Sequence, residues 1–308
     1  MKALLTVPGN LLLLGEYAVL EKGGQGIGLA VERRVRIQVE EAEGLSIVGR
    51  TGNETFSWSP ELGRAGLIGA VVESVKAELG RLGSGGEAPR LAISIDSSAL
   101  FAEDGTKLGL GSSSAVASGL ALALLRCSGI DGQALSDSSF RASLAAHRSA
   151  QGGIGSGYDV AASLRGGLVL FTGGEEPGIE ALELTWMRPL HLVRGPGPVE
   201  TARAIRRYQD WKARRPRAAR AFLEASNEVV VEFARARDWA EATRLLNEGA
   251  RLGLDLGEAI GVSARIGRLE GGAGKALGAG NEIGATWGET AAEGLEMRVS
   301  GAGPLWSE

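Results

Sequence analysis

The chain has 308 residues, of which 44% are hydrophobic, enough for one large domain or two domains of ordinary size. Its formal net charge of -4 offers no global electrostatic case for binding nucleic acid. Cys127 is the only cysteine, so an internal disulfide is excluded and a reducing, cytoplasmic location is expected. No apolar run approaches the roughly 18 residues of a membrane-spanning helix, so no membrane partner is expected.

The N-terminal part of the chain has the pattern of β structure with one helix. Apolar runs at 3–7 and 11–14 flank Pro8-Gly9, which predicts a strand, a turn and a strand. Residues 29–40 and 91–97 alternate apolar and polar side chains, as half-buried strands do. Residues 61–83 between them carry apolar side chains at helical spacing, which predicts a helix.

Small apolar residues at 113–127 predict a tightly packed helix with a serine at its N-cap. A second helix is expected at 135–151, a strand in RGGLVLF after it, and one or two strands within 181–195. Three helices are expected within 199–260, and the last 40 residues return to glycine-rich strands and turns. We divide the chain into domains at 1–180 and 181–308.

The segment KLGLGSSSAVASGLALALL at 107–125 has the chemistry of a phosphate-binding loop. Gly109 and Gly111 permit positive φ, so successive N–H groups can point at one anion. A helix starts immediately afterwards, and its unpaired N–H groups and dipole favour negative charge. The serines that follow add hydroxyls, and Lys107 adds a positive charge. A serine-capped helix after a glycine turn is the alternative, and the Walker A pattern is absent.

Three segments in order resemble the first two signature motifs and the catalytic-aspartate segment of the GHMP kinases. They are PGNLLLLGEYAVLEKG at 8–23, KLGLGSSSA at 107–115 and AQGGIGSGYDVAAS at 150–163. A third family motif is matched more weakly by KALGAGNEIGATW at 275–287, where Asn281 and Glu282 replace the usual glycines. Within the family, GEYAVLE and the form of the aspartate segment are most similar to the phosphomevalonate kinases.

This resemblance implies an α+β, two-domain GHMP kinase fold. Its N-terminal domain would be like ribosomal protein S5 domain 2 and its C-terminal domain ferredoxin-like, with ATP and substrate in a cleft between them. The implied reaction transfers the γ-phosphoryl group of ATP to (R)-5-phosphomevalonate, in the mevalonate route to isoprenoids, with Mg²⁺ as the metal. A phosphorylated small molecule is therefore the expected partner, and the resemblance leaves a homodimer open.

The resemblance also assigns roles to residues. The ATP phosphates would contact Lys107, Gly109, Leu110, Gly111, Ser112, Ser113 and Ser114, and the Ser113 hydroxyl would be nearest to Mg²⁺. The substrate would contact Asn10, Glu16, Tyr17, Ser156 and Gly157. Asp159 would act as general base or as an orienting charge, although it could also cap the helix that follows it.

The chain departs from the family pattern at two places. Asn10 replaces the usual lysine of the first motif, and an amide supplies no charge. This loss is milder for a phosphate acceptor, whose second pKa of about 6 leaves it mostly ionised. Residues 141–151 contain no acid where some members hold magnesium. Mevalonate kinase, homoserine kinase and a catalytically weakened nucleotide-binding homologue therefore stay open as alternatives.

Two further features leave more than one interpretation. The basic run from Arg203 to Arg220 is either a solvated helix face or a surface that attracts anionic substrates. His147 and His191 are the only histidines, so zinc spacing is absent. A Ser-His-Asp hydrolase is not excluded by residue counts, but no G-x-S-x-G elbow precedes a helix with suitable partners.

Overall fold

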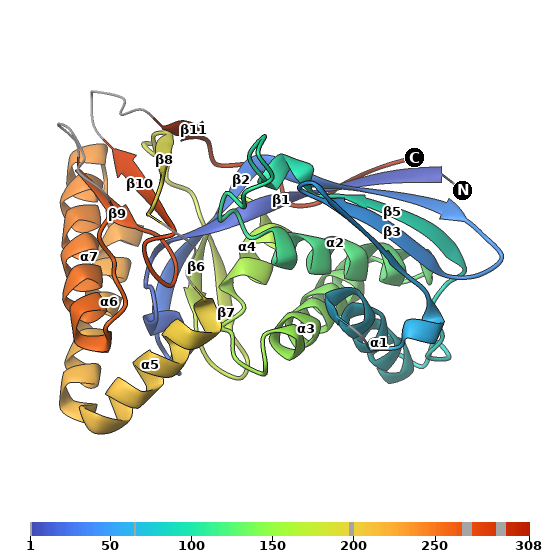
Figure 1. Ribbon diagram of the computed structural model, residues 1–308, viewed down its shortest axis with the longest axis horizontal. Helices are drawn as coiled ribbons and strands as arrows, with labels where there is room; N and C mark the ends of the chain where they lie inside the picture. Colours follow the sequence, from blue (N-terminus) through green and yellow to red (C-terminus); the bar gives the residue numbers. More distant parts are fainter. Residues whose placement is uncertain (1, 65, 197–199, 267–272, 288–293) are drawn as a thin grey trace. The chain divides into compact units, whose positions relative to one another are not determined.

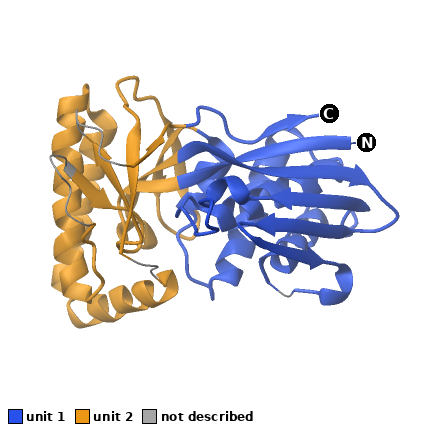
Figure 2. Cartoon of the chain, turned by 45° about the horizontal axis from the view of Figure 1, so that its top comes forward, with its two compact units in different colours: residues 1–10, 30–166, 300–308 blue, residues 11–29, 167–299 orange. Residues whose placement is uncertain are grey.

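The computed structural model describes residues 2–64, 66–196, 200–266, 273–287 and 294–308 (Figure 1). Its mixture of helices and sheets confirms the predicted α+β class. The chain forms two compact units (Figure 2). Unit 1 contains residues 1–10, 30–166 and 300–308, and unit 2 contains residues 11–29 and 167–299. The division into domains at residue 180 stays a prediction.

An eight-stranded sheet has a main path with the strand order β12, β1, β2, β5, β3, β4, and all of this path except residues 11–14 of β1 and 25–29 of β2 belongs to unit 1. These strands are Lys2–Leu14 (β1), Gln25–Glu41 (β2), Ser46–Thr51 (β3), Glu54–Trp58 (β4), Leu91–Asp96 (β5) and Leu305–Ser307 (β12). β3 runs parallel to β5, whereas β2 and β5 are antiparallel. In β5 the buried Leu91, Ile93 and Ile95 alternate with more exposed side chains, so one face of the strand is apolar.

Helices of unit 1 gather on one side of this sheet (Figure 1). They are Gly66–Arg81 (α1), Ser112–Cys127 (α2), Gly132–Ala150 (α3) and Tyr158–Arg165 (α4), and they confirm the helices predicted within 61–83, 113–127 and 135–151. The small residues of α2 permit close packing on the sheet. A Cβ atom at Gly119 would lie 2.5 Å from Ile37 and 2.7 Å from Val7.

The turn predicted at Pro8-Gly9 is wrong, because β1 continues through both residues. Neighbouring segments satisfy the backbone there. The carbonyl of Pro8 accepts a hydrogen bond from the Ser163 hydroxyl at 2.9 Å, and the N–H of Asn10 donates to the carbonyl of Leu110 at 2.9 Å. A Cβ atom at Gly9 would lie 2.6 Å from that carbonyl. Gly9 therefore serves a close backbone approach and not a turn.

Unit 2 contains two groups of antiparallel strands. Leu168–Thr172 (β6) pairs with residues 25–29 of β2 and with Gly178–Leu182 (β7). A separate four-stranded sheet has the order β11, β8, β10, β9. Its strands are Leu190–Arg194 (β8), Ala273–Ala276 (β9), Ile283–Trp287 (β10) and Leu295–Met297 (β11).

Three helices predicted within 199–260 are confirmed as Thr201–Arg214 (α5), Pro216–Arg235 (α6) and Trp239–Ile260 (α7). Pro216 separates α5 from α6, since proline fits the first turn of a helix but not its interior. Asp238 caps α7 by accepting a hydrogen bond from the N–H of Glu241 at 2.9 Å. In the part of the chain that the structure describes, no helix is long and apolar enough to cross a membrane.

Candidate active site

The glycine–serine loop leads directly into the N-terminus of α2 in unit 1. Gly109 and Gly111 both have positive φ, at 67° and 64°, as the sequence predicts. The N-cap of α2 is Gly111 in the left-handed conformation, so the prediction of a serine N-cap is wrong. The first N–H groups of a helix have no partner within it, and here they follow an exposed loop that includes Lys107. This arrangement suits an anionic group.

The three serines of the loop have different environments. The Ser114 hydroxyl is fully buried and donates to the carbonyl of Gly111 at 2.9 Å. Ser112 is half-buried and Ser113 is exposed. Leu110 is buried, and its carbonyl accepts a hydrogen bond from the backbone of Asn10. Of the three serine hydroxyls, those of Ser112 and Ser113 are therefore the ones that solvent or a ligand can reach.

Asn10 lies inside unit 1, with only 1% of its surface exposed. Its amide nitrogen donates to the hydroxyls of Ser114 and Ser163, both at 2.9 Å. These contacts join β1 to α2 and α4. The side chain is thus an internal tie between three segments, and its predicted contact with substrate stays a prediction.

Asp159 lies in the first turn of α4, where the helix dipole stabilises a negative charge. The N-cap is Gly157, so the alternative that Asp159 caps this helix is wrong. Gly157 has φ 95°, and a Cβ atom there would lie 2.4 Å from Leu144. Arg148 holds the preceding loop by donating to the carbonyls of Gly155 and Ser156 at 2.8 and 3.0 Å.

His147 joins the serine loop to Asp159. Its Nε2 atom lies 3.1 Å from the Ser113 hydroxyl, and its Nδ1 atom lies 3.2 Å from a carboxylate oxygen of Asp159. The imidazole is 4% exposed, whereas Ser113 is exposed. Two predicted site residues are therefore brought together through a histidine that the sequence motifs do not include.

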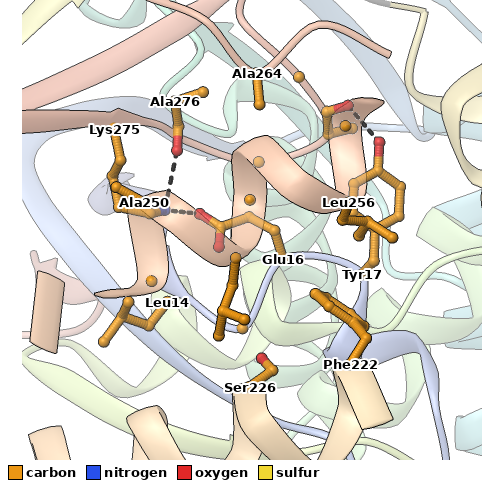
Figure 3. A pocket seen from close by; sticks show the side chains of 18 of the residues that line it. Leu14, Glu16, Tyr17, Phe222, Ser226, Ala250, Leu256, Ala264, Lys275 and Ala276 are labelled. Atoms are coloured by element: carbon orange, nitrogen blue, oxygen red, sulfur yellow. Dashed lines mark hydrogen bonds and ion pairs between the residues drawn. The ribbon is translucent and has the colours of Figure 1, made fainter. Parts of the chain in front are cut away.

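Glu16 and Tyr17 lie in unit 2, beside a cavity of about 40 Å³ that also contacts α6 and α7 (Figure 3). The Glu16 carboxylate is paired with the ammonium group of Lys275 from β9, and the Tyr17 hydroxyl donates to the carbonyl of Ala279 at 2.6 Å. Both polar groups thus have partners inside unit 2, and their predicted contact with substrate stays a prediction.

Burial dominates the electrostatics of the Glu16–Lys275 pair. It raises the pKa of the Glu16 carboxyl above its ordinary value, and the nearby Lys275 charge only partly opposes this rise. Lys275 itself is almost fully buried. Burial, followed by the Glu16 charge, also raises the pKa of the Tyr17 phenol, which therefore remains a hydrogen-bond donor at neutral pH.

Tyr17 has strained backbone geometry. Among the described residues it is the only one other than glycine with positive φ, at 62°. Such a conformation costs of order 1–3 kcal/mol and persists when surrounding contacts fix it. Here the Tyr17 ring packs on Tyr208 of α5 with 5.2 Å between centroids, within a cluster that includes Leu256 and Ile260 of α7.

The weakly matched third motif forms the β9–β10 hairpin of unit 2. Gly278 in its loop has φ 72°, so one of the expected glycines adopts a conformation that requires glycine.

In the basic run, Lys212 pairs with Glu21 at 2.6 Å and Arg206 pairs with Glu200 at 3.4 Å. Residues 197–199, in the segment before α5, lie outside the described residues.

Comparison with known proteins matches part of the chain to a known family. Residues 66–167 match the family described as GHMP kinases N terminal domain. Over 185 residues the chain is 31% identical to the phosphomevalonate kinase of Streptomyces sp. (strain CL190). The chain therefore contains a GHMP kinase N-terminal domain at residues 66–167. The part aligned with the Streptomyces protein covers 53% of this chain and 48% of that protein, about half the length of each.

Solved structures confirm the two-domain GHMP kinase fold. The Lin0012 protein from Listeria innocua is similar with a TM-score of 0.79 and 23% identity, covering 94% of this chain and 91% of that one. Streptococcus pneumoniae phosphomevalonate kinase, in a complex with phosphomevalonate and AMPPNP, has a TM-score of 0.71 and 18% identity. That likeness covers 92% of this chain and 91% of the other.

The oxygen donors beside the serine loop would suit a magnesium ion. The described residues contain no cluster of three or more His, Cys, Asp or Glu side chains placed to hold a metal. The exposed Ser113 hydroxyl is a hard oxygen ligand beside the predicted phosphate loop. Mg²⁺ usually retains several waters and is held by one or two protein groups together with substrate phosphates.

His147 lies outside every matched motif, and Lys275 begins the third-motif segment but was given no role by the resemblance. His147 is in the stretch 141–151, which contains no acid, and it faces Ser113 and Asp159. Gln151, one helical turn later, also contacts its Nε2 atom at 3.3 Å. Polar residues four apart share a helix face, so the His147 and Gln151 spacing is the signal that could have indicated a polar site.

Proposed function

We propose that this protein is a GHMP kinase that transfers the γ-phosphoryl group of ATP to (R)-5-phosphomevalonate, giving ADP and 5-diphosphomevalonate. The proposal is supported by the family of residues 66–167 and by the likeness to phosphomevalonate kinases in sequence and fold. One observation carries it furthest. In unit 1, an exposed serine hydroxyl at the N-terminus of α2 is joined through His147 to Asp159, the carboxylate expected at the acceptor.

The residues of unit 1 have complementary tasks in this reaction. The N–H groups at the start of α2 and the positive charge of Lys107 would bind the triphosphate. Asp159 would orient the acceptor or take its proton. Bound magnesium would neutralise charge on the phosphate oxygens, and Ser113 is the residue that would contact it. Catalysis of phosphoryl transfer depends mostly on positioning and electrostatics, and these residues supply both.

The chemical class of the phosphoryl acceptor is inferred from Asn10, which stands where the first motif usually has a lysine. Asn10 is uncharged, and its amide nitrogen already donates hydrogen bonds to the hydroxyls of Ser114 and Ser163. The chain therefore has no cation at this position to favour an ionised alcohol. A phosphate monoester is mostly ionised at neutral pH, because its second pKa is about 6. An acceptor that already carries a phosphate suits this chain better than mevalonate or homoserine.

A coupled ADP-release assay with a panel of acceptors tests the proposal. Phosphomevalonate, mevalonate and homoserine are offered separately with ATP and magnesium, and product is identified by mass spectrometry. We expect turnover with phosphomevalonate and at least tenfold lower kcat/KM with the two alcohols. Turnover on an alcohol with none on phosphomevalonate would overturn the acceptor. ATP binding without turnover on any member would favour the nucleotide-binding homologue.

A further inference from the structure

His147 is a buried imidazole with defined partners on both ring nitrogens. It lies on α3, between Ser113 on α2 and Asp159 on α4. Its 4% exposure leaves almost no access to water, so these partners determine the state of the ring. The phosphate-loop and aspartate motifs account for Ser113 and Asp159, but neither includes the histidine between them.

The contacts specify which ring nitrogen carries the proton. A carboxylate only accepts hydrogen bonds, so the Nδ1 atom that faces Asp159 must be the donor. In a ring that carries one proton, Nε2 then has a lone pair, which the Ser113 hydroxyl and the amide nitrogen of Gln151 face at 3.1 and 3.3 Å. The Asp159 contact thus indicates the tautomer with hydrogen on Nδ1 and a lone pair on Nε2.

This tautomer fixes the direction of the Ser113 hydroxyl. With Nε2 as an acceptor, the O–H of Ser113 donates inward along the 3.1 Å contact. The hydroxyl oxygen then presents its lone pairs to the exposed side of the loop. An oxygen in this orientation is an acceptor, which suits a cation that accompanies phosphates and does not suit a phosphate oxygen.

We propose that His147 is a positioning residue that orients both Asp159 and the Ser113 hydroxyl for phosphoryl transfer. The proposal rests on the proposed kinase function for its catalytic meaning, but the tautomer is a property of the free protein. The Nδ1–H group holds the carboxylate of Asp159, whose other oxygen accepts the N–H of Val160 at 2.9 Å. The Nε2 lone pair accepts the hydroxyl hydrogen of Ser113, which leaves the Ser113 oxygen facing outward as an acceptor.

Nitrogen-15 NMR of protein labelled at histidine tests the tautomer directly. His147 and His191 are the two histidines, so a His191→Gln variant assigns the spectrum without altering the site. We expect the two-bond couplings and shifts of His147 to report a proton on Nδ1, whereas free imidazole side chains favour Nε2. A proton on Nε2 of His147 would overturn the proposal. The experiment needs neither ATP nor an acceptor.

Two substitutions separate the hydrogen bonds. The amide of glutamine reaches the position of Nε2, so His147→Gln can keep Ser113 but loses the contact to Asp159. The amide of asparagine reaches only the position of Nδ1, so His147→Asn can keep Asp159 but loses Ser113. We expect His147→Gln to lower kcat about tenfold with little change in KM for MgATP. We expect His147→Asn to raise that KM about three- to tenfold with a smaller loss of kcat.

Controls distinguish positioning from packing. His191→Gln should leave kcat and KM within about twofold of wild type, because His191 lies in β8 of unit 2. Equal losses of melting temperature in both His147 variants, with kcat and KM unchanged, would show a structural role and overturn the proposal. If no acceptor is phosphorylated but the NMR spectrum shows the Nδ1–H tautomer, the kinase proposal fails and the orientation of His147 stands.

Discussion

Asp159 is the single residue whose charge should matter most for turnover. In Asp159→Asn an amide replaces the carboxylate, and its NH₂ group would face the N–H donor of His147 or displace the contact to Val160. We expect kcat to fall about 10²–10⁴-fold, the usual contribution of a positioned acid or base. Steady-state kinetics give kcat, and calorimetric titration with ATP should show affinity within about threefold of wild type.

Asp210 offers a matched control for this substitution. It is an exposed aspartate on α5 that takes no part in the Ser113, His147 and Asp159 contacts, so Asp210→Asn removes the same charge without changing them. Its kcat should equal that of wild type. An Asp159→Asn enzyme with wild-type kcat would contradict a catalytic role for this carboxylate.

Lys275 stabilises the buried carboxylate of Glu16. Removing the Glu16 charge should therefore offset the stability that is lost when Lys275 is replaced. Lys275→Met leaves Glu16 buried without its partner, which should lower the free energy of unfolding by about 3–5 kcal/mol at neutral pH. Adding Glu16→Gln should restore most of this loss, because burial already favours the uncharged form of the side chain. Urea unfolding of the wild-type protein, of Lys275→Met and of the double variant measures both effects.

The pH dependence of Lys275→Met follows from the raised pKa of Glu16. In the folded variant the carboxyl holds its proton to higher pH than in the unfolded chain, where its pKa is about 4.3. The deficit should therefore shrink as the pH falls toward 4 and grow as the pH rises above it. A deficit independent of pH, also present in the double variant, would indicate lost packing and not an unpaired charge.

Residue types were easier to predict than residue partners. The glycines with positive φ at 109 and 111 follow from the motif itself, because local backbone geometry selects glycine. The pairs Ser113–His147 and Glu16–Lys275 join residues 34 and 259 positions apart. Only the packing of distant elements decides such contacts, so no local pattern could have indicated them.

At the scale of elements, α7 depends on its first turn. Asp238 accepts the N–H of Glu241, and a Glu241 oxygen accepts the N–H of Arg237 at 2.9 Å, which resembles a capping box. Asp238→Ala should lower the free energy of unfolding by about 1 kcal/mol. Asp238→Asn keeps the capping oxygen and should lose much less. Urea titrations of both variants test this. An Asp238→Ala variant as stable as the wild-type protein would show that the cap contributes nothing.

Helices were predicted better than turns because their pattern repeats. Apolar spacing and breakers located α1, α2 and the three helices of 199–260. Pro8-Gly9 misled because a proline and a glycine usually mark a turn, whereas here the loop at Leu110 and the hydroxyl of Ser163 satisfy the strand. The cap of α2 misled for a related reason, since Gly111 takes the position expected for a serine.

At the scale of the whole molecule, each ligand should protect a different unit. ATP should slow amide hydrogen exchange in unit 1 peptides that contain 107–116 and 157–162, because bound ligand opposes local opening. Phosphomevalonate should slow exchange in unit 2 peptides around Glu16 and Tyr17, if these residues contact it as the motif resemblance implies. Mass spectrometry of exchanged peptides measures both. Protection by ATP confined to unit 2 would contradict the placement of the nucleotide.

The tie between Asn10 and Gly111 has a consequence for sequence variation. A Cβ atom at Gly111 would lie 2.2 Å from the amide of Asn10, and Gly111 has φ 64°. The space beside one residue is therefore occupied by the other, although 101 positions separate them in the chain. A mutational library at position 111 should therefore return mainly glycine. A smaller residue at position 10 would remove the close contact but not the requirement of the positive φ, so varying both positions together should still select glycine at 111.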